Sequence, residues 1–179
     1  MKEISLNILD IVENSVKAKA TLTEILLNET DEQLELLIKD NGRGMSQETV
    51  NTVTNPFYTT RTTRKVGLGI PLLKLACEQT GGSFKITSSI EENTHGTSVT
   101  AIFNKKHLDF TPLGDVVASI TTLIQGHPET DFLFSHKTKN GEVLLDTRTL
   151  REVLQDVPLN SYEVIKWIEE YLNEQYSNI

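Results

Sequence analysis

The segment from Asp40 to Met45, with the sequence DNGRGM, contains the residues best suited to binding chemistry. A carboxylate, Asp40, directly follows the largely apolar run Leu34–Lys39, which predicts a strand. A carboxylate fixed at a strand end can accept hydrogen bonds from an amino group in a pocket. Gly42 and Gly44 are expected to allow positive φ and to let another molecule approach the backbone. A surface hairpin would also fit this segment taken alone.

An upstream helix predicted from Ser5 to Ala20 adds a second group of polar side chains. Asp10, Asn14 and Lys17 follow helical spacing and fall on the side opposite the apolar residues. An amide oxygen can bind a hard cation, an ammonium can meet a phosphate, and a carboxylate can orient water. An ordinary solvated helix face is the alternative interpretation.

Two further stretches could meet an anion. The polar loop 55–65 contains three cations in an otherwise acidic chain, and it is interpreted equally well as an ordinary mobile loop. Gly67 and Gly69 precede a predicted helix with Pro71 in its first turn. Glycines before a helix leave free backbone N–H groups at the positive end of the helix dipole, although packing glycines give the same pattern.

The elements that must position these residues predict an α+β protein. After the first helix, strands are expected at 21–28 and 33–39, a short helix capped by Ser46, a helix ending before Gly81, and strands at 84–89 and 98–103. This order favours a two-layer sandwich of mixed, mainly antiparallel sheet with helices on one face.

The rest of the chain predicts a helix, a hairpin and two more helices. The first helix is expected at 111–125, and the hairpin strands at 132–137 and 142–146 around Asn140-Gly141. The last two helices are expected from Thr147 or Thr149 to Val157 and from Asn160 or Ser161 to about Tyr171. No chemistry is assigned to this part, and His127 and His136 are interpreted as satisfied surface histidines.

Composition narrows the function classes. The net charge of −8, from 17 basic and 25 acidic residues, argues against general nucleic-acid binding. The single cysteine, Cys77, excludes an internal disulfide and is expected to be a buried structural thiol. No signal peptide or stretch of about 20 apolar residues is found, so we expect a cytoplasmic protein without a membrane partner.

In this order, the motifs resemble the ATP-binding domain shared by DNA gyrase, heat-shock 90 chaperones, sensor histidine kinases and mismatch-repair ATPases. The matching stretches are Leu9–Ala20 (N box), Asp40–Met45 (G1 box), Pro56–Arg61 (F box), Gly67–Ile70 (G2 box) and His95–Thr97. The resemblance implies the Bergerat-type ATP-binding fold for residues 1–106. Residues 107–179 would form a small C-terminal α/β extension, which resembles the tail of small stand-alone ATPase-domain proteins of anaerobic bacteria.

The resemblance also implies a ligand, ATP with Mg²⁺, and roles for individual residues. Asn14 would hold Mg²⁺, Lys17 would meet phosphate, and Asp40 would accept from the adenine amino group with help from Thr97 through water. The other implied cofactor-binding residues are Gly42 and Gly44 beside the base and ribose; Thr59, Thr60 and Arg61 in a lid; Gly67, Leu68 and Gly69 as backbone donors; and Met45 and Phe57.

Asp10 is the candidate catalytic base, and it departs from the family pattern. Hydrolytic members carry a glutamate four residues before the N-box asparagine, and Asp10 is one methylene shorter. Glu13 is expected to point away from the face that carries Asp10 and Asn14. Because the N box lies near the start of the chain and no histidine falls in a dimerising helix, a self-phosphorylating histidine kinase of the usual form is not expected.

Three functions remain open from the sequence. The first is phosphate transfer from ATP to an unidentified protein partner, in which positioning and charge stabilisation matter more than a strong base. The others are an ATP-hydrolysing conformational switch and a non-catalytic adenine-nucleotide sensor.

Overall fold

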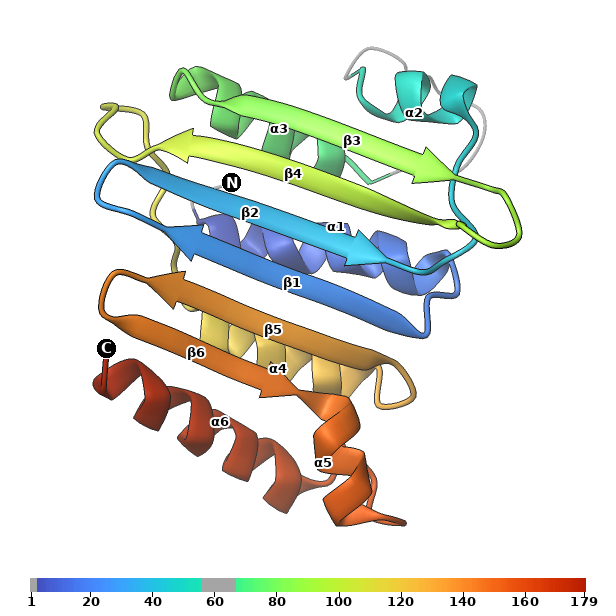
Figure 1. Ribbon diagram of the computed structural model, residues 1–179, viewed down its shortest axis with the longest axis vertical. Coiled ribbons are helices and arrows are strands. Elements are labelled where there is room, and N and C mark those ends of the chain that lie inside the picture. Colours follow the sequence, from blue (N-terminus) through green and yellow to red (C-terminus); the bar gives the residue numbers. More distant parts are fainter. Residues whose placement is uncertain (1–2, 56–66) are drawn as a thin grey trace.

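The computed structural model describes residues 3–55 and 67–179. Its helices and strands are arranged around one six-stranded sheet with the order β3-β4-β2-β1-β5-β6 (Figure 1). In chain order they are α1 (Ile4–Lys17), β1 (Leu22–Glu29), β2 (Gln33–Asp40), α2 (Gln47–Val53), α3 (Gly69–Gln79), β3 (Ser83–Ser89), β4 (Gly96–Asn104), α4 (Val116–Gly126), β5 (Asp131–Thr138), β6 (Gly141–Asp146), α5 (Thr147–Leu154) and α6 (Tyr162–Ser177).

The predicted fold class is confirmed. β1 and β5 are parallel and the other neighbouring strands are antiparallel, so the sheet is mixed and mainly antiparallel. Helices α1, α3 and α4 cover one face of the sheet (Figure 1). Alternate side chains of the central strands, such as Ile25 and Leu36, are fully buried against them. The apolar side of α1 contributes Ile4 and Ile8, which are also fully buried.

The C-terminal segment extends the same sheet. Strand β5 pairs with β1 along its length, from Leu22 opposite Asp131 to Asn28 opposite Lys137. The predicted hairpin around Asn140-Gly141 is present as β5 and β6. The boundary predicted between residues 1–106 and 107–179 stays a prediction, although both parts share one sheet.

The helix predicted from Thr111 begins only at Val116, where the Asp115 side chain caps it by accepting from the Ala118 N–H. The preceding residues are used elsewhere, because the carbonyls of Pro112 and Leu113 accept the first backbone N–H groups of α1. These bonds satisfy donors that a helix cannot satisfy itself.

Other helix ends also differ from prediction. α1 ends at Lys17, and Lys19 has a φ of 62°. The cap of α5 is Asp146 rather than a threonine. α6 continues to Ser177 instead of ending near Tyr171, because Leu172 is fully buried and the chain gains packing by remaining helical.

Of two expectations about single residues, the one for Cys77 is confirmed and the one for His136 is wrong. Cys77 is fully buried as predicted, and burial raises the pKa of its thiol to about 11. His136 was expected at the surface, but it is only 3% exposed and is hydrogen-bonded on both ring nitrogens. In the described part of the chain, no helix combines the length and apolar character that crossing a bilayer requires.

Candidate functional site

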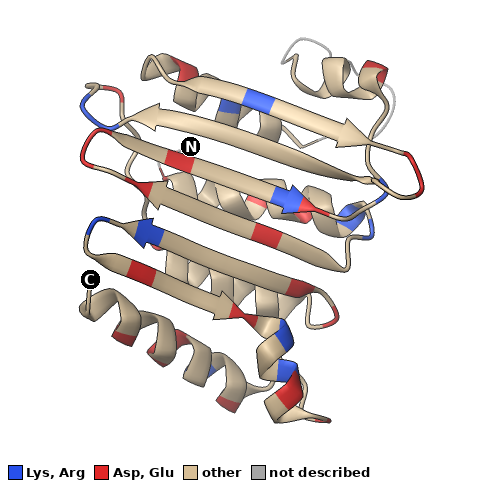
Figure 2. Cartoon of the chain, viewed as in Figure 1, with Lys and Arg blue, Asp and Glu red and all other residues tan. Residues whose placement is uncertain are grey.

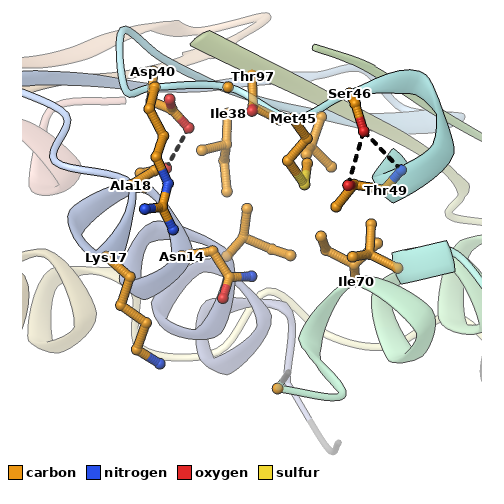
Figure 3. Close-up of a pocket in the computed structure, with 17 residues that line it drawn as sticks. Asn14, Lys17, Ala18, Ile38, Asp40, Met45, Ser46, Thr49, Ile70 and Thr97 are labelled. Carbon is orange, nitrogen blue, oxygen red and sulfur yellow. Dashed lines mark hydrogen bonds between the residues drawn. The ribbon is translucent and has the colours of Figure 1, made fainter. Parts of the chain in front are cut away.

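A cavity of about 460 Å³ lies where the end of α1 meets strands β2 and β4 and helices α2 and α3 (Figure 3). Its size is in the range of small-molecule sites. Apolar side chains such as Ile38, Ile70 and Val99 form part of the wall. The predicted site residues that line it are Asn14, Lys17, Asp40, Gly44, Met45, Gly67 and Thr97.

Asp40 lies at the end of β2 with its carboxylate fixed from two sides. One oxygen, Oδ2, accepts from the Ser15 hydroxyl at 2.7 Å, and Oδ1 accepts from the Gly42 N–H at 2.8 Å. A carboxylate has about four lone-pair positions, so capacity remains for a donor in the cavity. Ser15 is only 2% exposed and was missed by sequence reasoning. The available signal was a hydroxyl on the apolar side of α1, beside Asn14.

The two glycines of this turn serve different purposes. Gly44 has a φ of +71°, and an added Cβ would lie 1.7 Å from the Ser89 carbonyl oxygen, so the predicted positive φ is confirmed there. The expectation of positive φ at Gly42 is wrong. Its missing side chain makes room for Ala18, whose Cβ would lie 2.8 Å from an added Cβ. Gly42 therefore lets the end of α1 pack against the turn.

Thr97 belongs to a hydrogen-bonded group opposite Asp40. The Ser88 hydroxyl lies 2.8 Å from the Thr97 hydroxyl, bonds the Gly96 carbonyl at 2.9 Å and accepts from the Met45 N–H at 2.8 Å. Because Ser88 donates its one hydrogen to Gly96, the Thr97 hydroxyl donates to Ser88 and keeps its lone pairs for the cavity. Ser88 was not identified from the sequence.

His95 ties the start of β4 to the glycine turn. Its Nδ1 lies 2.7 Å from the Gly42 carbonyl oxygen. Because a carbonyl can only accept, this ring nitrogen must carry the hydrogen. Gly96 beside it has a φ of +139°, and an added Cβ would lie 2.1 Å from the Asp40 carbonyl oxygen. The match at His95–Thr97 therefore reflects close backbone packing against Asp40.

Polar side chains from the last turns of α1 lie away from Asp40. Asn14 and Lys17 both line the cavity (Figure 3). Gly67 adds an open position, since nothing lies within 4 Å of an added Cβ. Arg43 also lines the cavity, a residue that sequence reasoning did not single out. The cavity thus has a carboxylate on one wall and cationic groups at other points of its lining.

A family model described as "Histidine kinase-, DNA gyrase B-, and HSP90-like ATPase" matches residues 2–107. The chain belongs to this family. Membership in this ATPase family supports ATP binding, and the site described above lies within the matched residues.

Named relatives of this ATPase-family chain include two bacterial kinases. Sensor histidine kinase YvrG of Bacillus subtilis is 30% identical over 103 residues, which are 54% of this chain and 17% of that protein. Sporulation kinase C of the same organism is 30% identical over 90 residues, which are 49% of this chain and 20% of that protein. The chain therefore corresponds to a fifth or less of these relatives.

Solved structures share the ATPase-family fold. The Aquifex aeolicus MutL ATPase domain complexed with ADP has a TM-score of 0.55 and 19% identity, covering 87% of this chain and 70% of that one. The N-terminal domain of a DNA repair protein has a TM-score of 0.58 and 17% identity, covering 82% and 53%. Both comparisons show the fold alone.

The Mg²⁺ expected from the sequence resemblance would have few protein ligands here. In residues 3–55 and 67–179, no group of three His, Cys, Asp or Glu side chains could hold a metal ion. Asn14 offers one amide oxygen at the cavity. This donor set fits Mg²⁺, which usually takes one or two protein ligands and completes its octahedron with water and substrate phosphates.

Asp10 lies close to Gly69 where α1 packs against α3. Asp10 is exposed and does not line the cavity, but its Cβ would be 2.8 Å from a Cβ added to Gly69. Leu68 is 51% exposed just before α3. Glu13 points away, as predicted, because its Oε1 bonds the His127 Nε2 at 2.6 Å. Phe57, Thr59, Thr60 and Arg61 lie outside the described residues.

Proposed function

We propose that the chain binds ATP with Mg²⁺ and transfers the γ-phosphoryl group to a protein partner. The observation that carries this proposal is the Asp40 carboxylate, oriented by Ser15 and Gly42 toward a cavity whose lining also includes Asn14 and Lys17. In this arrangement Asp40 would accept from the adenine amino group, and Thr97 would hold a water between them. Selectivity for adenine over guanine follows, because guanine has no amino group at that position.

The other residues of the cavity would handle the phosphates. Asn14 would contribute its amide oxygen to Mg²⁺, which when bound offsets the charge of the β- and γ-phosphates. Lys17 would add a positive charge at the cavity mouth, and the backbone N–H groups near Gly67 and Gly69 would donate to phosphate oxygens at the start of α3. Transfer would form a bond from phosphorus to the partner's acceptor atom, break the bond to the bridging oxygen, and release ADP and the acceptor's proton.

Transfer is favoured over hydrolysis by the short side chain of Asp10, which is one methylene shorter than the glutamate of hydrolytic members and would hold a water less well. The names of two relatives, a sensor histidine kinase and a sporulation kinase, also support phosphotransfer. Hydrolysis is a second candidate, because Asp10 lies one helical turn before Asn14 and could orient water toward the phosphates.

Calorimetric titration of the full chain tests the binding step. We expect ATP to bind with Mg²⁺ more tightly than without it, and GTP to bind at least tenfold more weakly than ATP. Equal affinity for ATP and GTP would contradict the role of Asp40. No binding of either nucleotide at millimolar concentration would overturn the proposal.

Incubation with γ-labelled ATP and purified candidate proteins tests the transfer step. Label on a candidate protein, with matching ADP, supports transfer. Free labelled phosphate without labelled protein would instead identify an ATPase, and Asp10→Asn should then abolish turnover while ATP binding remains. Intact ATP after binding would identify a non-catalytic nucleotide sensor.

A further inference from the structure

Helix α6 concentrates the aromatic side chains that carry polar groups. The only tryptophan of the chain and three of its four tyrosines fall on this helix. One of them, Tyr176, faces inward and bonds the His136 Nδ1 at 2.8 Å. The others face solvent, with Tyr162 76%, Trp167 47% and Tyr171 36% exposed. Aromatic residues of this kind are enriched at the energetic centres of protein interfaces.

Trp167 and Tyr171 form a stacked pair in which each ring has one face toward the other ring and one face away from it. Their rings are stacked, with centroids 4.9 Å apart and planes only 11° from parallel. The packing of α6 onto the protein does not need them, because Val164, Ile168 and Leu172 are the buried residues of this helix. The pair is therefore a preorganised, partly exposed aromatic surface, and no other ring of residues 3–55 and 67–179 packs on it.

A partner would contact side chains of α6 here rather than add a strand to β6, because a side chain already bonds the free edge of β6 at Leu144. Gln175, one turn after Tyr171, donates from its Nε2 to the Leu144 carbonyl at 3.0 Å, and its Oε1 accepts from the Leu144 N–H at 2.9 Å. These bonds occupy backbone groups of the edge strand β6 that an added strand would need.

Carboxylates surround the aromatic pair. α6 carries four glutamates and a single cation, Lys166, which lies 3.9 Å from Glu170. Glu163 lies one turn before Trp167, and Glu174 lies three residues after Tyr171. Within residues 3–55 and 67–179, no ion pair involves Glu163 or Glu174. Figure 2 shows acidic positions along α6.

We propose that the flank of α6 formed by Glu163, Trp167, Tyr171 and Glu174 binds a basic, arginine-bearing segment of a partner protein. A guanidinium plane stacks on an aromatic face and pairs with carboxylates through a planar fork, so this surface suits arginine more than lysine. A second copy of the chain fits poorly, because a net charge of −8 would bring acidic surfaces together.

The proposed surface is distant from the cavity. It lies beyond β6 at one end of the sheet, whereas the cavity is formed at β2 and β4, with β1 and β5 between them (Figure 1). A partner held on α6 would leave the cavity open, so binding at α6 does not depend on nucleotide binding.

The test is a titration of the full chain with labelled amphipathic peptides. One peptide carries arginine at positions one helical turn apart, and matched versions carry lysine or glutamine. We expect the arginine peptide to bind, to change the emission of Trp167, and to bind more tightly than the lysine version. Trp167→Ala with Tyr171→Ala should weaken binding about tenfold or more, measured by peptide anisotropy. Calorimetry should show ATP affinity unchanged in this double variant.

A matched pair of charge variants separates a specific site from general attraction to an acidic protein. Glu163→Gln with Glu174→Gln should weaken arginine-peptide binding by about tenfold. Glu92→Gln with Glu152→Gln removes the same charge from exposed positions outside α6 and should leave binding within about twofold. Equal losses in the two charge variants would overturn the proposal, as would absence of binding. A dimer in sedimentation that the aromatic double variant dissociates would overturn it in favour of self-association.

Discussion

Two groups of polar side chains on the helix-covered face of the sheet have opposite arrangements. At β2 and β4, the Asp40 carboxylate accepts from Ser15 and Gly42 and faces a cavity of about 460 Å³. At β1 and β5, the half-buried Glu29 carboxylate bonds the Lys105 ammonium at 2.6 Å and the His136 ring at 2.9 Å. The first group keeps acceptors open toward a cavity, whereas the second is closed by protein groups.

In the closed group, the position of each shared hydrogen follows from the pKa shifts and the hydrogen-bond partners. Burial lowers the pKa of His136 despite the Glu29 carboxylate beside it, so the ring is neutral at pH 7. Its Nε2–H then donates to Glu29, and its Nδ1 accepts from the Tyr176 hydroxyl at 2.8 Å. Burial also raises the pKa of Tyr176, which keeps that hydroxyl protonated. Each polar atom of the ring has a protein partner.

This difference separates a binding role from a stabilising role. A buried polar side chain costs free energy unless it is hydrogen-bonded, and a satisfied group adds stability without inviting a ligand. The His136 group joins β1 and β5 to α6, so we assign it to holding the C-terminal segment onto the sheet. For the Asp40 group we propose ligand recognition, because its remaining acceptors face the cavity.

The largest expected effect is on nucleotide affinity. Asp40→Asn replaces an acceptor oxygen with a donor at the place proposed for the adenine amino group, and should cost about 2–4 kcal/mol of ATP binding free energy. Calorimetry measures the loss, and Asp156→Asn at an exposed, distant position is the control. Wild-type ATP affinity in the Asp40→Asn variant would mean that the Asp40 group, like the Glu29 group, does not bind the ligand.

The next effect is on folding. His136→Ala leaves Glu29 and Tyr176 without their shared partner and opens a cavity, so the free energy of unfolding should fall by about 2–4 kcal/mol. Urea denaturation measures this loss, with the exposed His107→Ala as the control. ATP affinity of the folded variant should remain at the wild-type value, and a parallel loss of affinity would show that the two groups are coupled.

A smaller effect is expected at Ser15. Ser15→Ala removes the hydroxyl that orients Asp40, and should weaken ATP binding by about 1 kcal/mol, or roughly fivefold. Ser119 is also buried in a helix but lies on α4, so Ser119→Ala controls for loss of a buried hydroxyl. If both variants bind ATP equally well, Ser15 does not position the carboxylate.

The most gradual effect is on the pH dependence of stability. The pKa of His136 is below its ordinary 6.5, so below pH 6.5 the unfolded chain binds a proton that the folded chain does not. Burial would raise the pKa of Glu29, but bonds from Lys105 and His136 outweigh it and lower this pKa below 4.5. Both shifts reduce stability as pH falls, first below pH 6.5 for His136 and then below pH 4.5 for Glu29.

Urea denaturation over a pH series measures this dependence. His136→Gln should flatten the decline that begins below pH 6.5 and leave the later one. Stability that rises in the wild-type chain on acidification from pH 6.5 would contradict the assignment of a neutral, buried ring.

The sequence correctly predicted the position of residues whose placement depends on a single helix or strand. The apolar run before Asp40 and the glycines after it placed a carboxylate at a strand end, and helical spacing placed Glu13 away from Asn14. Ser15 was missed because its partner, Asp40, lies 25 residues away in sequence. An isolated hydroxyl on an apolar helix face gives no sign of what it bonds.

Tertiary contacts explain the other errors. His136 was placed at the surface because its burial depends on Glu29 and Tyr176, which reach it from β1 and α6. The start of α4 was placed too early because the pattern of apolar residues does not reveal that Pro112 and Leu113 bond α1. Helix ends are decided by such competition for backbone groups.

The parallel pairing of β1 with β5 has a consequence for synthesis on the ribosome. β5 follows β1 by about a hundred residues, so the backbone groups of β1 that face it stay unpaired until most of the protein has been translated. An incomplete nascent chain exposes that edge to other chains, which is a route to aggregation. Expression of a fragment ending near residue 107 would make the same exposure permanent.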